Sequence, residues 1–178
     1  FLWIFASFYT ISYVNKNSIK KSTRFLSLFT LAVSSAIGLS ISANLLTFFI
    51  FYELLTIATW PLVSHKETKE AIGAGRRYLI YTLSGASLMV LGIAIIWKYS
   101  GNLDFQQSTG MLDEVPLRLR NLTIGLLLLG ASVKAAIVPL HSWLPRAMVA
   151  PTPVSALLHA VAVVKAGVFA MLIMMKNV

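Results

Sequence analysis

The stretch Asn121-Leu-Thr-Ile-Gly-Leu-Leu-Leu-Leu-Gly-Ala-Ser-Val-Lys-Ala-Ala-Ile-Val-Pro-Leu140 decides the fold, because it is long enough to cross a bilayer and carries one charge, Lys134. An ammonium group at the centre of a membrane helix costs about 2.5–3.5 kcal/mol on insertion scales. Such a lysine is therefore expected to face a protein interior and to mark a path for ions or protons. Two further stretches repeat the pattern, with Glu53 central in 44–64 and Lys165 central in 154–175.

The composition also indicates a membrane protein. Hydrophobic residues make up 57% of the 178 residues and charged residues 12%, which leaves no room for a soluble domain. The lack of cysteine excludes disulfides, thiolate metal sites and a thiol nucleophile, and the three histidines have no metal-ligand spacing. We expect no metal and no cofactor, and a chain that is not catalytic by itself.

Five apolar stretches are long enough to be full transmembrane spans: 25–43, 44–64, 78–97, 121–140 and 154–175. Backbone groups in lipid must be hydrogen-bonded internally, and the stretches lack strand alternation, so we predict an all-α membrane bundle. Residues 1–14 are apolar but shorter, which indicates a truncated helix. We therefore expect a fragment with a single transmembrane domain over 1–178, in which 1–24 hold the truncated helix and a basic loop and 25–178 form a five-helix unit.

Basic residues gather in two loops. They are Lys16, Lys20, Lys21 and Arg24 in one loop, and Lys66, Lys69, Arg76 and Arg77 in the other. Lys and Arg in short loops stay on the cytoplasmic side, so these loops are predicted inside and the segments 42–44 and 100–120 outside. This orientation accounts for the net charge of +9, which gives no support to nucleic-acid binding. The expected location is the cytoplasmic membrane of a bacterium or archaeon, as a multi-pass protein.

Four prolines follow Lys134 closely: Pro139, Pro145, Pro151 and Pro153. A regular helix cannot run through them, because each proline removes a backbone donor and clashes with the preceding turn. We predict a break inside or at the edge of the membrane, where irregular backbone is tolerated if it is buried in protein or lines a wet cavity. Proline content alone fits an ordinary interfacial loop equally well.

Glu53 and Lys134 fall at similar depths on different predicted helices. Each charge stabilises the ionised form of the other, whereas desolvation favours both neutral forms, so the pair is poised to exchange protons. The alternative is a static buried ion pair that fixes helix packing.

His159 and Lys165 share the last predicted helix, about 9 Å apart in rise and roughly 120° apart around the axis, so water or a neighbour would have to bridge them. A histidine titrates near physiological pH, which suits a relay, although a lone histidine is more often a hydrogen-bonded packing residue. We predict a proton relay of Glu53, Lys134, His159 and Lys165. His65 and His141 are interpreted as interface residues.

Three motifs carry a resemblance to a known family: Phe-Tyr-Glu-Leu-Leu-Thr at 51–56, Gly-Ala-Ser-Val-Lys-Ala at 130–135, and Pro-Leu-His-Ser-Trp-Leu-Pro-Arg-Ala-Met-Val-Ala-Pro-Thr-Pro-Val-Ser-Ala-Leu-Leu-His at 139–159. They resemble the proton-conducting antiporter-like subunits shared by Mrp-type cation/proton antiporters, respiratory complex I and membrane-bound hydrogenases. The resemblance implies two inverted five-helix units, each with a discontinuous helix near a central lysine, and this chain is similar to the first unit.

The resemblance also implies roles for single residues. It pairs Glu53 with Lys134, makes His159 and Lys165 the inward relay, and makes the four prolines the hinge of the broken helix. Lys165, together with Thr-Trp-Pro-Leu-Val-Ser-His at 59–65, is more similar to the Mrp-type D and A subunits than to the distal complex I subunit.

The implied function is membrane proton translocation as a subunit of a multisubunit Na+/proton antiporter. The implied partners are other membrane subunits, protons, sodium ions and the lipid bilayer. One alternative is a proton-pumping subunit of an NADH-quinone oxidoreductase or membrane-bound hydrogenase, with no cofactor held in this chain. A further alternative is a non-conducting membrane scaffold, whose buried ion pair only orders assembly.

Overall fold

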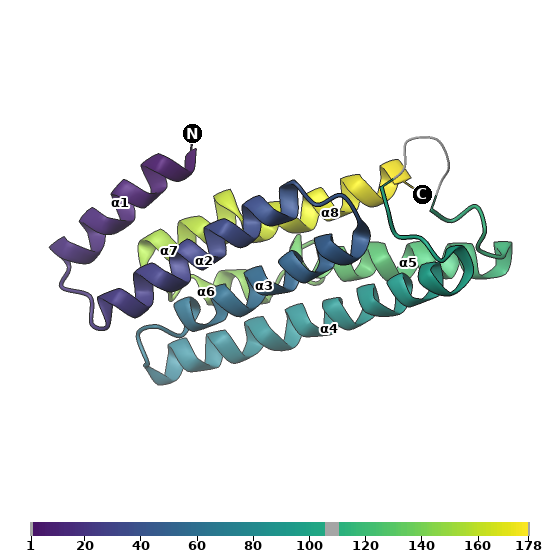
Figure 1. Cartoon of the computed structure of the whole chain (residues 1–178). Helices are drawn as coiled ribbons and strands as arrows, with labels where there is room; N and C mark the ends of the chain where they lie inside the picture. Colours follow the sequence, from purple (N-terminus) through teal and green to yellow (C-terminus); the bar gives the residue numbers. More distant parts are fainter. Residues whose placement is uncertain (1, 106–110, 178) are drawn as a thin grey trace.

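The computed structural model describes residues 2–105 and 111–177, which form helices packed side by side in an elongated bundle (Figure 1). The prediction of an all-α membrane protein is confirmed, since the described residues contain helices and one isolated bridge, between Asn44 and Asp104. The elements are α1 (Leu2–Lys16), α2 (Ser22–Ser40), α3 (Leu45–Val63), α4 (Lys69–Ser100), α5 (Leu117–Lys134), α6 (Trp143–Ala147), α7 (Thr152–Ala156), η1 (Leu157–Val161) and α8 (Val163–Asn177).

Local capping sets the ends of the two central helices. The Asn44 side chain accepts a 2.7 Å hydrogen bond from the Thr47 amide at the start of α3, and Thr68 caps α4 through the Ala71 amide. Gly101 ends α4 in the left-handed conformation, with φ of 65°. The 32 residues of α4 extend about 48 Å, so this helix is longer than the roughly 30 Å hydrocarbon core.

Four helical segments of the described chain are long and apolar enough to cross a membrane: Ser22–Ser40, Leu45–Val63, Lys69–Ser100 and Thr152–Lys176. The predicted span 121–140 does not form one regular helix, because α5 ends at Lys134. Pro139 accounts for this end, since a helix through it would bring its ring against the carbonyl of Ala135. The chain then turns through Ala136, with φ of 55°, before the short helix α6.

The predicted span 154–175 is also interrupted. It consists of α7, the π-helical turn η1 and α8, and Ala162 between η1 and α8 has φ of −125° and ψ of −68°. The irregular backbone at Ala162 separates His159, which lies in η1, from Lys165, which lies in α8. π-Helical turns are rare and frequently occur at functional sites.

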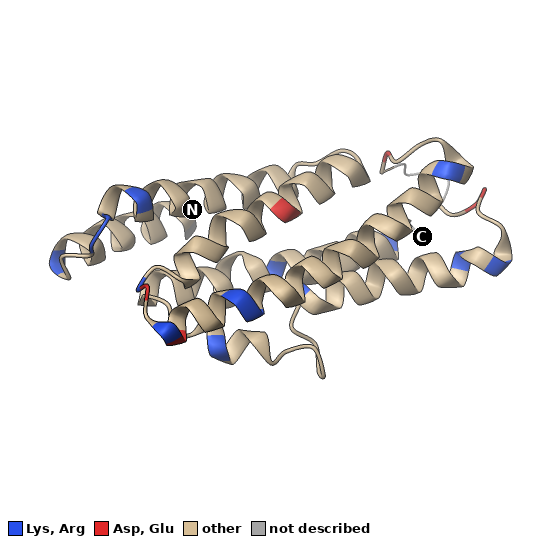
Figure 2. Cartoon of the chain, turned by 90° about the horizontal axis from the view of Figure 1, so that it is seen from below, with Lys and Arg blue, Asp and Glu red and all other residues tan. Residues whose placement is uncertain are grey.

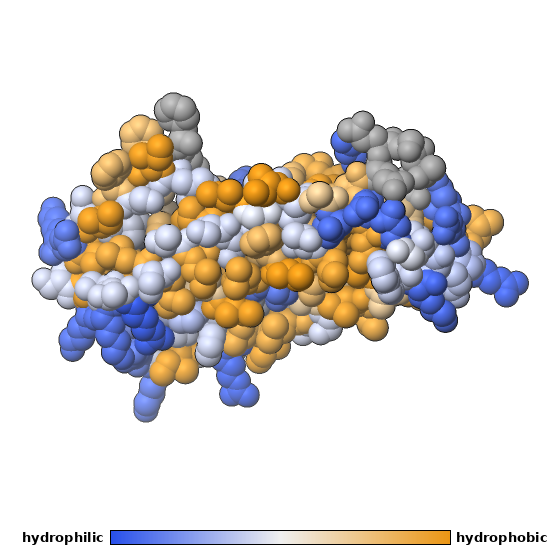
Figure 3. All heavy atoms as spheres, viewed as in Figure 1, coloured by the Kyte–Doolittle hydropathy of each residue, from blue (hydrophilic) through white to orange (hydrophobic). Residues whose placement is uncertain are grey.

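The surface has the character expected of a protein surrounded by lipid. Charged residues gather toward the two ends of the bundle, and apolar side chains cover much of its middle (Figures 2 and 3). Ile50, Ile57 and Leu172 are each more than half exposed, at 56%, 58% and 59%. Such exposure of large aliphatic side chains suits a hydrocarbon environment.

The two basic loops lie at the same end of the bundle. A cavity of about 570 Å³ is lined by Lys20 and Lys21 from one loop and by His65, Lys66 and Glu67 from the other. The Lys21 ammonium donates a 2.5 Å hydrogen bond to Glu67 Oε1. A shared end for both loops agrees with the orientation predicted from the basic residues.

Helices α4 and α5 touch through their backbones. A Cβ on Gly130 would lie 2.5 Å from the Gly85 carbonyl oxygen, and a Cβ on Gly85 would lie 2.8 Å from the Gly130 carbonyl oxygen. Small residues at such contacts are typical of membrane helices, because they allow close approach. The contact lies one turn before Lys134 and so fixes the depth of that lysine against α4.

Candidate functional site

Lys134 is the last residue of α5, and its side chain is 1% exposed. Its Nζ lies 3.2 Å from Glu53 Oε1 and donates a 2.5 Å hydrogen bond to the Tyr52 carbonyl oxygen. The same Nζ lies 3.3 Å from the centre of the Tyr52 ring. One ammonium group therefore contacts a carboxylate, a carbonyl and an aromatic face, all three of which stabilise a positive charge.

The end of α5 is held from several sides. Trp143, fully buried in α6, donates a 2.9 Å hydrogen bond from Nε1 to the Val133 carbonyl in the last turn of α5. Gly167 of α8 lies against the next turn, where a Cβ would come within 2.2 Å of the Ala135 amide nitrogen. A cation at a helix C-terminus is also favoured by the helix dipole. The lysine is thus positioned by packing and by electrostatics.

Glu53 lies in the middle of α3 and is 15% exposed. One carboxylate oxygen contacts Lys134, whereas Oε2 is buried and has no hydrogen-bond partner among the described residues. The Tyr52 hydroxyl is also buried and has no hydrogen-bond partner among the described residues. A buried carboxylate oxygen without a donor is costly, so Oε2 is available to a proton or to a donor from outside the described part of the chain.

A set of buried hydroxyl groups lies between this pair and the end with the basic loops. The Thr59 and Tyr78 hydroxyl oxygens are 2.7 Å apart, and both residues are fully buried, as is Thr56. The Tyr78 ring packs on Trp143, with ring centres 5.2 Å apart. Sequence reasoning missed these residues and Tyr52; the available signal was the spacing of Glu53, Thr56 and Thr59 on one helix and the position of Tyr52 beside Glu53.

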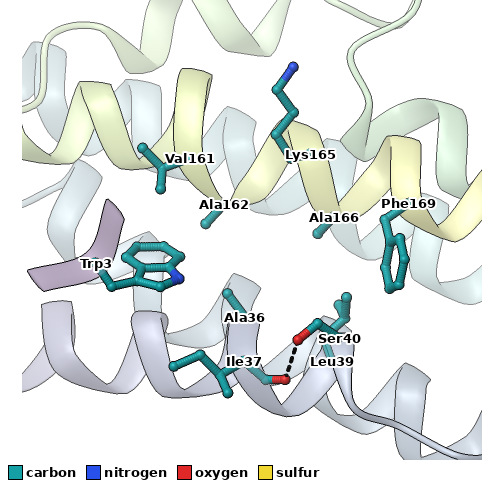
Figure 4. A pocket seen from close by; sticks show the side chains of 10 residues that line it. All are labelled: Trp3, Ala36, Ile37, Leu39, Ser40, Val161, Ala162, Lys165, Ala166 and Phe169. Carbon is teal, nitrogen blue, oxygen red and sulfur yellow. Dashed lines mark hydrogen bonds between the residues drawn. The ribbon is translucent and has the colours of Figure 1, made fainter. Parts of the chain in front are cut away.

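Of the four predicted relay residues, the structure brings Glu53 and Lys134 together and leaves His159 and Lys165 apart from them. Both of the latter are exposed on this chain. Figure 4 shows the Lys165 side chain pointing away from Ile37 and Ser40, which line the same cavity of about 310 Å³ between α1, α2 and α8. Among the described residues, no hydrogen bond or ion pair joins Lys165 or His159 to the Glu53–Lys134 pair.

The four prolines predicted as a hinge lie at different places around the break. Pro139 is exposed in the non-helical segment after α5, and Pro145 is exposed within α6. Pro151 and Pro153 are buried at the start of α7. Of the two histidines interpreted as interface residues, His141 is exposed, and His65 Nε2 lies 3.0 Å from the Lys20 carbonyl oxygen.

A helical membrane bundle with a buried ion pair beside a broken helix defines an antiporter-like membrane subunit. The family model described as "NADH:quinone oxidoreductase/Mrp antiporter, TM" matches residues 42–178, and the chain belongs to this family. It is 35% identical over 168 residues to the provisionally named antiporter subunit mnhA2 of Staphylococcus aureus (strain MSSA476), which covers 93% of this chain and 21% of the relative. The chain thus spans about a fifth of the length of the curated relatives it matches.

Solved structures of respiratory and antiporter complexes contain chains with a similar arrangement of helices. A chain of the archaeal membrane-bound sulfane sulfur reductase superposes with a TM-score of 0.79 and 28% identity, over 86% of this chain and 31% of that one. A chain of the Mrp complex from Dietzia sp. DQ12-45-1b superposes with a TM-score of 0.74 and 23% identity, over 84% of this chain and 28% of that one. A chain of respiratory complex I from Thermus thermophilus superposes with a TM-score of 0.74 and 24% identity, over 94% of this chain and 36% of that one. The similarity to these last two structures is a similarity of fold alone.

Proposed function

We propose that this chain is part of a subunit that moves protons across the membrane in a multisubunit Na+/proton antiporter. The observation that carries the proposal is the Lys134–Glu53 contact of 3.2 Å at the end of a broken helix, with Glu53 Oε2 unpartnered among the described residues. A buried ion pair adds little stability compared with apolar side chains, so its presence calls for another reason. Proton exchange supplies that reason.

The pair can pass a proton in two steps. When Glu53 takes up a proton on its free oxygen, Lys134 loses its counter-charge, and the desolvated ammonium is then favoured to give up its own proton. The Tyr52 carbonyl retains the lysine in place while this happens. The hydroxyls of Thr59 and Tyr78 are candidates for the connection to the cytoplasmic side.

His159 and Lys165 continue the relay in this proposal. Both are exposed on the surface of the described chain, although they lie in the apolar segment 152–176 that is able to span a membrane. A lysine facing lipid at this position would be costly, so we propose that another part of the full-length protein or a neighbouring subunit covers it. The π-turn at His159 and the four prolines then provide the irregular backbone that lines the path.

The proposed architecture completes the expected five-helix unit. Helix α5, residues 135–142 and α6 together form a discontinuous fifth crossing, and the unit is one of two inverted repeats of the full-length protein. The proposed location is the cytoplasmic membrane of a bacterium or archaeon, with other subunits, protons, sodium ions and lipid as partners.

A second candidate is a proton-pumping subunit of a redox complex. It is favoured by the likeness to a chain of the archaeal sulfane sulfur reductase, at 28% identity. A non-conducting scaffold is the third reading, in which the pair has a packing role alone.

Sodium-driven dissipation of a proton gradient in everted vesicles separates these readings. The full-length protein in its assembled complex is compared with Lys134→Ala and Glu53→Gln, and Lys98→Ala, an exposed lysine at the end of α4, is the matched control. We expect the flux to be lost in the first two variants and kept in the third. Unchanged flux in an assembled Lys134→Ala complex would overturn the relay, and flux that depends on a redox substrate and not on sodium would support the second candidate.

A further inference from the structure

A cavity of about 690 Å³ lies between the first turns of α4 and the short helix α6, at the end of the bundle that holds the basic loops. Its lining includes Lys69, Glu70 and Arg77 from α4 and Arg146 from α6. Three cations face one carboxylate, which gives the cavity a net charge of +2. None of these four residues belongs to the Glu53–Lys134 site.

The positive charge of the three cations exceeds that of the single carboxylate in the lining, Glu70. Lys69, Arg77 and Arg146 are exposed and form no ion pair within the described part of the chain, in contrast to Lys21 and Arg24, which share Glu67. Lys69, Gly73 and Arg77 follow one another at intervals of four residues, so they lie along one face of α4. A Cβ on Gly73 would meet no atom within 4 Å, so the face is open between the two cations.

The walls of the cavity are fixed to each other just below it. The Ser142 hydroxyl, at the start of α6, donates a 2.7 Å hydrogen bond to the Tyr81 hydroxyl, one turn beyond Arg77 on α4. Trp143 packs on Tyr78 in the same layer. The cavity is therefore preformed, because its two walls cannot separate without breaking these contacts.

The depth of the cavity follows from the length of α4. Its uncharged run starts at Tyr78 and continues to Trp97, which is the length that crosses the hydrocarbon core. Arg77 therefore lies at the boundary between hydrocarbon and headgroups, and Lys69 lies about 12 Å further out. The headgroup layer is only about 5–8 Å thick on each side, so the cations cover its whole depth.

Part of the lining is apolar. Pro145, Met148 and Val149 line the cavity together with the cations, and Met148 is 39% exposed. Ile80, one turn below Arg77, is 54% exposed on the membrane side. A ligand here meets positive charge and apolar lining side chains, and Ile80 offers it an exposed aliphatic side chain one turn below Arg77.

We propose that this cavity binds the phosphate headgroup of an anionic phospholipid from the cytoplasmic leaflet. Arg77 and Arg146 bind the phosphate oxygens, since guanidinium groups suit that geometry, and Lys69 adds charge at the outer rim. Basic pockets between membrane helices on the cytoplasmic side are suited to such headgroups. Ile80 below Arg77 and the apolar lining residues contact the glycerol and the acyl chains, and a free phosphate ion would leave these side chains uncovered.

Native mass spectrometry of the intact full-length complex in detergent tests the proposal, with added phosphatidylglycerol as the probe and phosphatidylcholine as the neutral reference. We expect the wild type to retain phosphatidylglycerol in preference, and Arg77→Gln/Arg146→Gln to bind it about thirtyfold more weakly, because each cation near the surface contributes about 1 kcal/mol. Arg77→Lys/Arg146→Lys keeps the charge and is expected to restore most of the affinity.

The matched control is Arg76→Gln/Lys66→Gln, which removes two exposed cations from the same end but outside this cavity. The proposal is overturned if this control weakens binding as much as the cavity variant, or if the cavity variant binds like the wild type. It is also overturned if inorganic phosphate binds where phosphatidylglycerol does not, or if no lipid binds because protein fills the cavity in the complex. If the double variant does not assemble, Arg146→Gln alone replaces it in the test, with an expected loss of about fivefold in the affinity for phosphatidylglycerol.

Discussion

The Ser142 hydroxyl donates a 2.7 Å hydrogen bond to the Tyr81 hydroxyl, and this contact joins the segment after the break in α5 to the middle of α4. The neighbouring Trp143 holds the end of α5 itself through the Val133 carbonyl. The irregular backbone between Lys134 and α6 is thereby fixed at both ends. A break that is fixed in this way positions the backbone of Lys134 relative to α4 and α6.

Removing the contact between α4 and α6 should lower stability without removing a charge. We expect Tyr81→Phe to reduce the free energy of unfolding by about 0.6–1 kcal/mol, because side-chain hydrogen bonds between membrane helices contribute about this much. Thermal unfolding in detergent, followed by circular dichroism, measures the effect. Ser84→Ala is the control, since the exposed Ser84 hydroxyl donates to the Ile80 carbonyl of its own helix and bonds to no other group within residues 2–105 and 111–177. An equal loss in both variants would contradict the prediction.

The backbone contact between α4 and α5 should tolerate no side chain. We expect Gly130→Leu to separate the helices and to cost at least about 1–3 kcal/mol, as overpacking in a filled interior does. Gly125→Leu on the same helix should be close to neutral, because a Cβ there meets no atom within 4 Å. The yield of assembled complex from size-exclusion chromatography compares the two, and equal yields would show that the contact does not hold the helices together.

The Glu53–Lys134 pair should behave non-additively. Lys134 is 1% exposed and Glu53 15% exposed, so Glu53→Gln leaves the more deeply buried charge alone and is expected to cost about 3–5 kcal/mol. Glu53→Gln/Lys134→Met removes both charges and should recover much of that loss while remaining inactive in transport. A double-mutant cycle on unfolding free energies measures the coupling. Costs that simply add would show that the two side chains do not interact energetically.

Much of the fold follows from the sequence, because apolar length and charge decide which helices can cross a bilayer. The end of α5 shows the limit of that reasoning. Residues 135–138 are apolar and extend the hydrophobic stretch, but Pro139 cannot follow a helical turn that includes Ala135, so the helix stops at Lys134. Hydrophobicity alone therefore placed the end of this helix six residues too late, at Leu140.

The pairing of Glu53 with Lys134 was predictable from the cost of burying each charge alone. The contact of Lys134 with the Tyr52 ring was not, since it depends on how α3 is rotated about its axis. The relative orientation of His159 and Lys165 depends on the π-helical turn η1. This turn could not be predicted from the sequence, because Leu157–Val161 contains no proline or glycine. Both side chains are exposed on the described chain.

His65 should titrate below the usual range for histidine. Burial lowers the pKa of His65 from 6.5, and the hydrogen bond to the Lys20 carbonyl opposes this effect. The carbonyl fixes the proton on Nε2, and Nδ1 is buried without a partner among the described residues, so a second proton is poorly accommodated. The imidazole signals in an NMR titration should therefore give a pKa below 6.5, and a value above it would contradict the structure.

The difference between the His65 pKa in the folded chain and in the unfolded chain makes the stability of the fold depend on pH. The unfolded chain binds the His65 proton at a higher pH than the folded chain. The contribution of neutral His65 to the free energy of unfolding is therefore complete above about pH 6.5, and it is lost as the pH falls through the pKa of His65 in the folded chain. Arg24 and Lys21 also lower the pKa of His65, so Arg24→Gln is expected to raise it toward the ordinary value. Arg118→Gln, at the other end of the bundle, should leave it unchanged.

The glycine contact between α4 and α5 also restricts how the length of this chain can change. Gly130 and Lys134 are four residues apart, a little more than one helical turn. An insertion or deletion of one residue between them would rotate the lysine by about 100° relative to the contact and turn it away from Glu53. Substitutions can be absorbed at open positions such as Gly125, but a change in length between Gly130 and Lys134 would remove the ion pair even with every functional side chain present.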